Sequence, residues 1–304
     1  MKKKKSEWIH KALVIFNPVS GVSVLRYGDE KIIKKYLKRK KIEYIFLETK
    51  EDNEKELKKF QPENFDLIIA VGGDGTVREV AHWMLKHKTK TPLAIIPGGS
   101  TNVYALGLGI PLTIRRALKF AVENKALPQD MGLVNNEKYF LFAAGAGYSA
   151  KFAQATTRDL KKIWGSLAYW AIAVVHSFNR DYIEGELQID GEKRKIKTRA
   201  LVIFNVRSAF SVNPYVPLDP TPGLLDVLIA DEITVANVMR LAKRLTEENR
   251  TLDQNQVKLI KTKKLSFKSN EEIPMEIDGE TWTGKELNIE LIPKALRIVC
   301  KKQL

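Results

Sequence analysis

The sequence predicts two domains, an α/β domain with a parallel sheet followed by a mainly antiparallel β-sandwich. Strand-like and helix-like segments alternate up to about residue 131, whereas strand-like runs follow one another from about 132 to 292. A chain of 304 residues with 44% hydrophobic side chains can fill two cores of ordinary size. The last residues, about 293–304, contain an apolar run that is compatible with either sheet.

In the first domain, short apolar runs bounded by turn residues predict buried parallel strands. The apolar residues Ile32, Ile33, Tyr36 and Leu37 recur at helical spacing, which predicts a basic amphipathic helix at about 30–41. The predicted strands are residues 12–16, 44–47, 66–71 and 92–96.

In the second domain, predicted strands outnumber predicted helices. The apolar segment 163–178, within a helix predicted at about 161–178, is shorter than the ~20 residues that cross a bilayer. We expect a largely buried helix there, with the alternative that it lines a lipid cleft or touches a membrane surface. The other predicted helices are about 147–159 and 235–244, and the predicted strands are residues 139–143, 182–189, 198–205, 224–229, 264–267, 275–277 and 287–291.

Two glycine-rich loops follow the third and fourth predicted strands of the first domain. They are Gly72-Gly73-Asp74-Gly75-Thr76 and Pro97-Gly98-Gly99-Ser100-Thr101-Asn102. Glycine lets backbone N–H groups approach an anion, and a helix that begins after such a loop adds the positive end of its dipole. Neither loop matches the P-loop or the Gly-x-Gly-x-x-Gly pattern. The two loops together predict a phosphate-binding site of another kind.

Two further polar positions follow the first and second predicted strands. Asn17-Pro18-Val19-Ser20-Gly21 comes directly after the first strand, and Thr49 comes just after the second. Breakers and side-chain acceptors are typical of turns. We therefore expect a third loop at the same sheet edge.

The charge of the chain favours an anionic partner. Its 51 basic and 36 acidic residues give a net charge of +15, which suits a nucleotide, a nucleic acid or an anionic membrane. The basic residues Lys2–Lys5 are followed by no apolar core of signal-peptide length, so we expect an intracellular protein. The single cysteine, Cys300, excludes an internal disulfide and a four-thiolate zinc site.

Near the end of the chain, the segment Glu276-Ile277-Asp278-Gly279-Glu280 places two carboxylates, Asp278 and Glu280, around a glycine at the end of a predicted strand. Asp-Gly is a favoured hairpin pair, so a simple turn is one interpretation. The other is a general base beside a phosphate site, because phosphoryl transfer needs a residue that orients or deprotonates the acceptor hydroxyl.

These motifs, in this order, resemble the diacylglycerol kinase catalytic-domain family, which includes sphingosine and ceramide kinases. The resemblance covers nearly the whole chain. The motifs that carry it are Asn17-Pro18-Val19-Ser20-Gly21, Gly72-Gly73-Asp74-Gly75-Thr76, Pro97 to Ala105, Asp130-Met131-Gly132, Ala144-Gly145-Ala146-Gly147 and Asp278-Gly279-Glu280. NAD kinases and phosphofructokinases are similar only around the first glycine loop.

The resemblance implies an NAD kinase/phosphofructokinase-like nucleotide-binding domain at 1–131 and a lipid-binding β-sandwich at 132–292. ATP and Mg²⁺ would be the cofactors. Asp74 and Asp130 would hold Mg²⁺, and Asp278 or Glu280 would act as the base. The residues implied to contact ATP are Asn17, Thr49, Gly72, Gly73, Asp74, Gly75, Thr76, Val77, Arg78, Ser100 and Asn102.

Some positions depart from the diacylglycerol kinase pattern. Val103 replaces an acid, Arg78 stands where asparagine is common, and Pro222 replaces an acid that belongs to a second magnesium site in some bacterial relatives. Asp219 or Asp226 are the alternatives for that site. The identity of the lipid therefore stays open.

The resemblance further implies a cytoplasmic enzyme that works peripherally at an anionic membrane on diacylglycerol or a sphingoid-like lipid. An NAD kinase-like activity and a non-catalytic nucleotide- or lipid-binding regulator are the alternatives. No nucleic-acid recognition motif accompanies the basic charge, so we expect no nucleic-acid partner. Self-association is left open.

Overall fold

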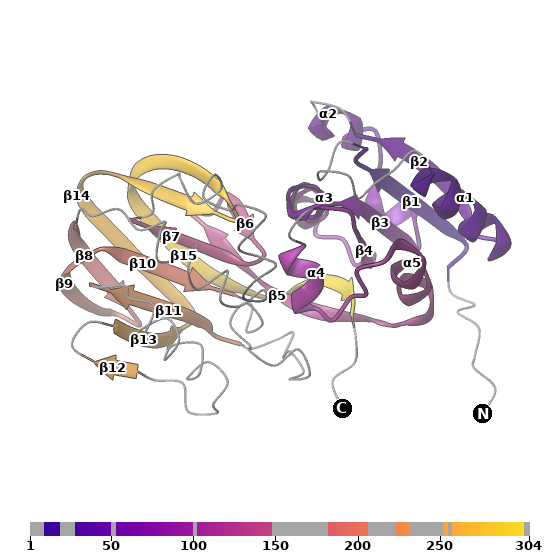
Figure 1. Ribbon diagram of the computed structural model, residues 1–304. Helices are drawn as coiled ribbons and strands as arrows, with labels where there is room; N and C mark the ends of the chain where they lie inside the picture. Colours follow the sequence, from indigo (N-terminus) through magenta and orange to yellow (C-terminus); the bar gives the residue numbers. More distant parts are fainter. Residues whose placement is uncertain are drawn as a thin grey trace. The chain divides into compact units, whose positions relative to one another are not determined.

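The computed structural model describes residues 9–18, 28–49, 53–99, 102–147, 182–205, 223–231, 252–254 and 257–300. The described residues form two compact units, one up to Asp130 together with Pro293 onwards, and one from Met131 to Ile292 (Figure 1). The helices predicted within 148–178 and at 235–244 lie outside the described residues, as does Ser100.

The N-terminal unit is built on a parallel sheet with the strand order β15-β4-β3-β1-β2. Its apolar runs are buried, as expected for strands covered on both faces. Only the end of β15 joins this sheet, through the parallel pair Ile298 and Leu93. The strands are β1 (Lys11–Phe16), β2 (Glu43–Glu48), β3 (Leu67–Gly72), β4 (Leu93–Pro97) and β15 (Glu280–Val299).

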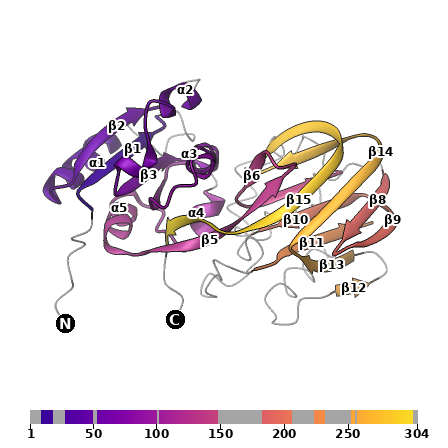
Figure 2. The same ribbon diagram turned by 180° about the vertical axis from the view of Figure 1, so that it is seen from behind.

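Helices cover both faces of this sheet (Figures 1 and 2). α1 packs beside α5, and α2 packs beside α3, as right-handed crossovers on either side of β1 require. The amphipathic helix predicted at about 30–41 is confirmed as α1. α5 was not predicted, although its apolar residues recur at helical spacing. The helices are α1 (Asp29–Arg39), α2 (Asn53–Leu57), α3 (Asp74–Lys86), α4 (Val103–Gly107) and α5 (Ile114–Glu123), with a short 3₁₀ turn, η1 (Pro62–Asn64).

The C-terminal unit is a largely antiparallel β structure, so the predicted fold class is confirmed. Its core is one cluster of buried side chains that includes Phe140, Leu187, Leu201, Val227 and Phe267. The strands are β6 (Lys138–Phe140), β7 (Ala143–Ala146), β8 (Ile183–Ile189), β9 (Glu192–Thr198), β10 (Ala200–Phe204), β11 (Leu225–Ala230), β12 (Leu252–Gln254), β13 (Val257–Thr262) and β14 (Lys264–Ile277), together with β5 (Ala126–Val134), whose residues up to Asp130 belong to the N-terminal unit.

β14 and β15 form a long hairpin, and β14 pairs with two further strands of this unit. The first half of β14 pairs with β8 and its second half pairs with β7. The register of β14 against β15 shifts between Lys268 and Ile273, where a bulge bends the hairpin. The prediction of separate strands at 264–267 and 275–277 was wrong, because the polar residues between them interrupt the hydrophobic pattern without ending the strand.

Candidate active site

The ends of the parallel strands bring three of the predicted loops to one sheet edge. β3 pairs with β1 and β4 in register, with Gly72 opposite Pro97. The N–H of Asn17 donates to the carbonyl oxygen of Val71 at 2.9 Å. The polar residues that follow β1, β3 and β4 are thus neighbours, as the sequence predicted.

The two glycine-rich loops touch through their backbones. A methyl group added to Gly99 would lie 2.5 Å from Cα of Gly73, which is closer than real Cβ contacts allow. The N–H of Gly98 also donates to the carbonyl oxygen of Gly72 at 2.7 Å. Glycine is therefore required here by close approach, and the two loops form one surface.

Polar side chains tie the loops together. Nδ2 of Asn17 donates to Oγ1 of the buried Thr76 at 3.0 Å, which joins the loop after β1 to α3. Oδ1 of Asp74 accepts the N–H of Tyr104 at 3.1 Å, which joins α3 to α4. Asn102 closes the second loop in the left-handed conformation, with φ 51°.

Asn102 makes two hydrogen bonds to a single glycine. Its Oδ1 accepts the N–H of Gly99 at 2.8 Å, and its Nδ2 donates to the carbonyl oxygen of the same residue at 2.7 Å. Asn102, which was predicted to contact ATP, thus fixes the backbone of the second glycine-rich loop. Asparagine suits this position because its short polar side chain tolerates positive φ.

The first turn of α3 offers backbone donors to an anion. The helix has 13 residues, begins at Asp74, and has Gly73 as its N-cap with no side-chain hydrogen bond to the cap. A helix N-terminus leaves N–H groups unsatisfied, which a phosphate can satisfy. Among the residues that the structure describes, a methyl group added to Gly75 would meet no atom within 4 Å, so these residues leave space beside the turn.

The remaining predicted nucleotide contacts lie around the same edge. The side chain of Val77 is buried in the core, whereas Arg78 is half-buried. Thr49 is buried, and its N–H donates to the carbonyl oxygen of Phe16 at 2.8 Å at the end of β1. These contacts place Thr49 beside the loop that contains Asn17.

Asp130 is a buried carboxylate in β5, with 3% of its surface exposed. Its Oδ1 accepts the N–H of Lys294 at 2.8 Å, so it anchors the final stretch of β15. Mg²⁺ is usually bound by one or two carboxylates together with substrate phosphates. The carboxylates of Asp74 and Asp130 suit that chemistry, and no cluster of three potential metal ligands occurs among the described residues. Their role in binding Mg²⁺ stays a prediction.

Asp278 and Gly279 form the two-residue turn of the β14–β15 hairpin. Their φ angles are 45° and 90°, which is the pattern of a type I′ turn. The Asp-Gly pair therefore does form the predicted hairpin turn.

The Asp278 carboxylate is also a hydrogen-bond acceptor for the segment before β7. Its Oδ2 accepts the N–H of Leu141 at 2.7 Å, and its Oδ1 accepts the N–H groups of Phe142 and Ala143 at 2.9 Å each. Three donors stabilise the ionised carboxylate and hold it in one position. Both of its oxygens are therefore engaged, while Glu280 lies exposed just after the turn.

Glu276 is a third carboxylate of this turn, which sequence reasoning did not single out. Burial raises its pKa from an ordinary value of 4.5 to about 7, the N–H of Gly279 lowers it in part, and the charge of Asp278 raises it further. A carboxyl with this pKa exchanges protons near neutral pH, which suits a general base. The sequence signal was its place two residues before Asp278, at the end of β14.

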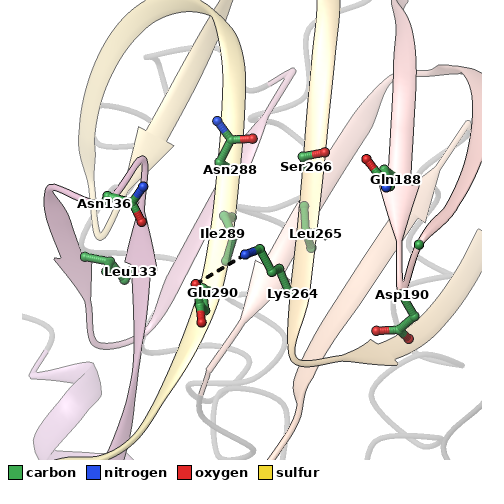
Figure 3. Close-up of a pocket in the computed structure, with 11 residues that line it drawn as sticks. Leu133, Asn136, Gln188, Asp190, Lys264, Leu265, Ser266, Asn288, Ile289 and Glu290 are labelled. Carbon is green, nitrogen blue, oxygen red and sulfur yellow. Dashed lines mark ion pairs between the residues drawn. The ribbon is translucent and has the colours of Figure 1, made fainter.

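A separate pocket of about 360 Å³ lies in the C-terminal unit, lined by residues of β5, β8, β14 and β15 and of the turns beside them (Figure 3). Lys264 and Glu290 form an ion pair across its lining at 3.6 Å. None of the predicted site residues lines it. The family motifs and this pocket therefore mark different parts of the molecule.

Two protein-family models match this chain, one over each part of it. The diacylglycerol kinase catalytic domain matches residues 11–134, and the YegS C-terminal NAD kinase beta sandwich-like domain matches residues 143–300. The chain therefore belongs to the diacylglycerol kinase and YegS-like family of lipid kinases.

Several relatives span most of the chain. A protein of Yersinia enterocolitica named "Probable lipid kinase YegS-like" is 32% identical over 76% of this chain and 78% of its own length. A diacylglycerol kinase of Bacillus subtilis is 29% identical over 89% of both chains. A crystal structure of a diacylglycerol kinase from Bacillus anthracis has a TM-score of 0.72 at 22% identity and covers 96% of this chain and 97% of that one, which shows the fold.

Among the described residues, no helix is long and apolar enough to span a bilayer.

Proposed function

We propose that this chain transfers the γ-phosphoryl group of ATP to a hydroxyl group of a membrane lipid. The observation that supports it best is the backbone contact between Gly73 and Gly99 at the start of α3. A surface of glycine N–H groups at a helix N-terminus fits the phosphates of a nucleotide. Asn17 and Thr76 hold the neighbouring loop against this surface.

Two carboxylates of the N-terminal unit would bind the metal ion. Asp74 and Asp130 would hold Mg²⁺, which when bound neutralises negative charge on the phosphates. Asp74 also holds the N–H of Tyr104, and Asp130 holds that of Lys294. These hydrogen bonds fix the orientation of both carboxyl groups before any cofactor arrives.

The carboxylates of the β14–β15 turn would act on the hydroxyl group of the lipid. We assign Asp278 the positioning of this turn, because its two oxygens accept three backbone N–H groups. Glu280, which is exposed, is the residue we assign to proton removal from the hydroxyl. Glu276, with a pKa of about 7, is the second candidate for this proton.

Transfer of labelled phosphate from ATP to a panel of lipids tests this function. The panel contains diacylglycerol, ceramide and sphingosine, with NAD as the non-lipid acceptor, and the product is identified by mass. Glu280→Gln is expected to lower kcat about 100-fold or more while the protein stays folded. Transfer to NAD and to no lipid would replace this proposal with an NAD kinase-like function.

A further inference from the structure

A helix pair with a strongly basic exposed side covers one face of the N-terminal sheet. α1 and α5 pack against each other there (Figures 1 and 2). Ile33 and Leu37 of α1 and Ala117 and Leu118 of α5 are buried, so the opposite sides of both helices face solvent. We call these opposite sides the α1–α5 face.

Nearly half of the net charge of the chain lies on this helix pair. Residues 29–41 and 114–123 contain ten basic and three acidic side chains, a net charge of +7 out of +15 for the whole chain. Glu123 lies near two of the lysines, at 3.7 Å from Lys40 and 4.0 Å from Lys119. The exposed cations are Lys31, Lys35, Lys38, Arg39, Lys40, Lys41, Arg115, Arg116 and Lys119.

Within the described residues, neither Arg115 nor Arg116 forms an ion pair with an acidic side chain. Both are exposed. The first turn of α5 also contains no acidic residue, so no carboxylate of this turn neutralises the two arginines.

Two exposed leucines flank the connection that leads into α5. Leu106 is 46% exposed in α4, and Leu112 is 47% exposed two residues before α5 begins. Two backbone hydrogen bonds hold this connection. The N–H of Gly109 donates to the carbonyl oxygen of Leu106, and the N–H of Ile110 donates to that of Ala105. Because Ile110 is buried at 3% exposure, it anchors the connection while the leucines remain at the surface.

We propose that the α1–α5 face, with Leu106 and Leu112, docks on an anionic lipid bilayer. The cations would contact lipid phosphates, and the leucines would enter the boundary between headgroups and acyl chains. A nucleic acid would match the charge, but the leucines gain nothing from an aqueous phosphate backbone. The inference rests on the proposed function, since an enzyme that phosphorylates a membrane lipid has to reach the bilayer.

Vesicle sedimentation of the full chain tests this surface. The vesicles contain phosphatidylcholine alone or mixed with phosphatidylglycerol. The triple variant Arg115→Ser/Arg116→Ser/Lys119→Ser is expected to bind the mixed vesicles about 100-fold more weakly, because each cation near the surface contributes to binding. All three side chains are exposed, so the fold is expected to persist, as circular dichroism would check.

A matched variant removes the same charge elsewhere. Lys193→Ser/Arg194→Ser/Lys195→Ser changes three exposed residues of β9 in the C-terminal unit, and it is expected to bind mixed vesicles as the native protein does. Equal loss in both triple variants would overturn the inference, because it would show only a dependence on net charge.

The leucines distinguish a bilayer from other anions. Leu106→Ser/Leu112→Ser is expected to weaken binding to mixed vesicles about tenfold and to have no effect on any binding to duplex DNA. Vesicle binding that is insensitive to both the leucine variant and the α5 variant would overturn the docking surface. DNA binding that is tight and lost in the α5 variant, without vesicle binding, would assign the face to nucleic acid instead.

Transfer of phosphate to diacylglycerol dispersed in detergent micelles separates this inference from the function. The α5 variant is expected to keep native activity there, because micellar substrate requires no docking on a bilayer. If micellar transfer persists and vesicle binding is native-like, the docking surface is wrong and the function stands. If the native protein phosphorylates no lipid but vesicle binding still depends on α5, the function is wrong and the docking surface stands.

Discussion

The two units position their candidate site residues by different physical means. In the N-terminal unit, Gly73 and Gly99 bring two loops into backbone contact. In the C-terminal unit, the charge of Asp278 holds three backbone N–H groups. The comparison shows that steric fit shapes the candidate nucleotide site, whereas electrostatic attraction shapes the candidate base site. Substitutions at the two places should therefore fail for different reasons.

Gly99→Ala should have the largest effect. The added methyl group would lie 2.5 Å from backbone, so the loops must separate, and a shift of about 1 Å can cost 100-fold. We expect ATP affinity to fall about 100-fold or more, as measured by calorimetric titration. Gly28→Ala, just before α1 and outside the candidate site, is the control for folding, because among the described residues its methyl group would meet no atom within 4 Å. Native affinity in Gly99→Ala would show that the loops do not act as one surface.

Asp278→Ala should destabilise the protein by about 3 kcal/mol, because three backbone N–H groups lose their acceptor. Urea unfolding measures the change. Glu280→Ala, on the other side of the same turn, is exposed and is expected to alter stability by less than about 0.5 kcal/mol. Equal stability of the two variants would refute the positioning role of Asp278.

Glu276→Gln should change how stability depends on pH. The native pKa of about 7 lies above the ordinary 4.5, so the folded state binds the proton more tightly than the unfolded state. Stability that this group contributes at low pH is lost as the pH rises from about 4.5 through 7. The variant should therefore gain about 2 kcal/mol relative to native protein between pH 5 and 8 in urea unfolding. A constant difference across that range would contradict the raised pKa.

Asn17→Ala and Thr76→Val should show the smallest effects. Each removes one neutral hydrogen bond of 3.0 Å, for which about 1 kcal/mol is expected. In a double-mutant cycle, the coupling energy should be about 0.5–1 kcal/mol. A coupling near zero would indicate that the loop after β1 is held by its backbone hydrogen bond to Val71 alone.

Much of the N-terminal unit could be predicted from local patterns. Buried parallel strands give continuous apolar runs, so β1, β3 and β4 were recognisable, and the loops after them were expected at one sheet edge. In the C-terminal unit, the long strands β14 and β15 contain polar interruptions at their bend, and they were divided into shorter pieces. Periodicity reports burial on one face, but it does not report whether a strand continues through a bulge.

The roles of several residues could not be predicted from local sequence patterns. The sequence singled out Asp278 and Glu280 but left their roles undivided, because the three N–H donors to Asp278 come from residues more than a hundred positions away. The raised pKa of Glu276 has the same origin, since burial is set by the packing of the whole unit. The basic segment 30–41 was visible, but its packing beside α5 was not.

The sequence by itself determined the fold class, the order of the motifs and the family. These depend on short-range features, namely glycine pairs after apolar strands, helical spacing and an Asp-Gly turn. Only the tertiary structure decided which of these residues meet: Gly73 with Gly99, Asp130 with Lys294, and Asp278 with the segment before β7. The physical reason is that steric contact, hydrogen-bond partnership and burial are properties of distance in space, and the folded chain sets those distances between residues far apart in sequence.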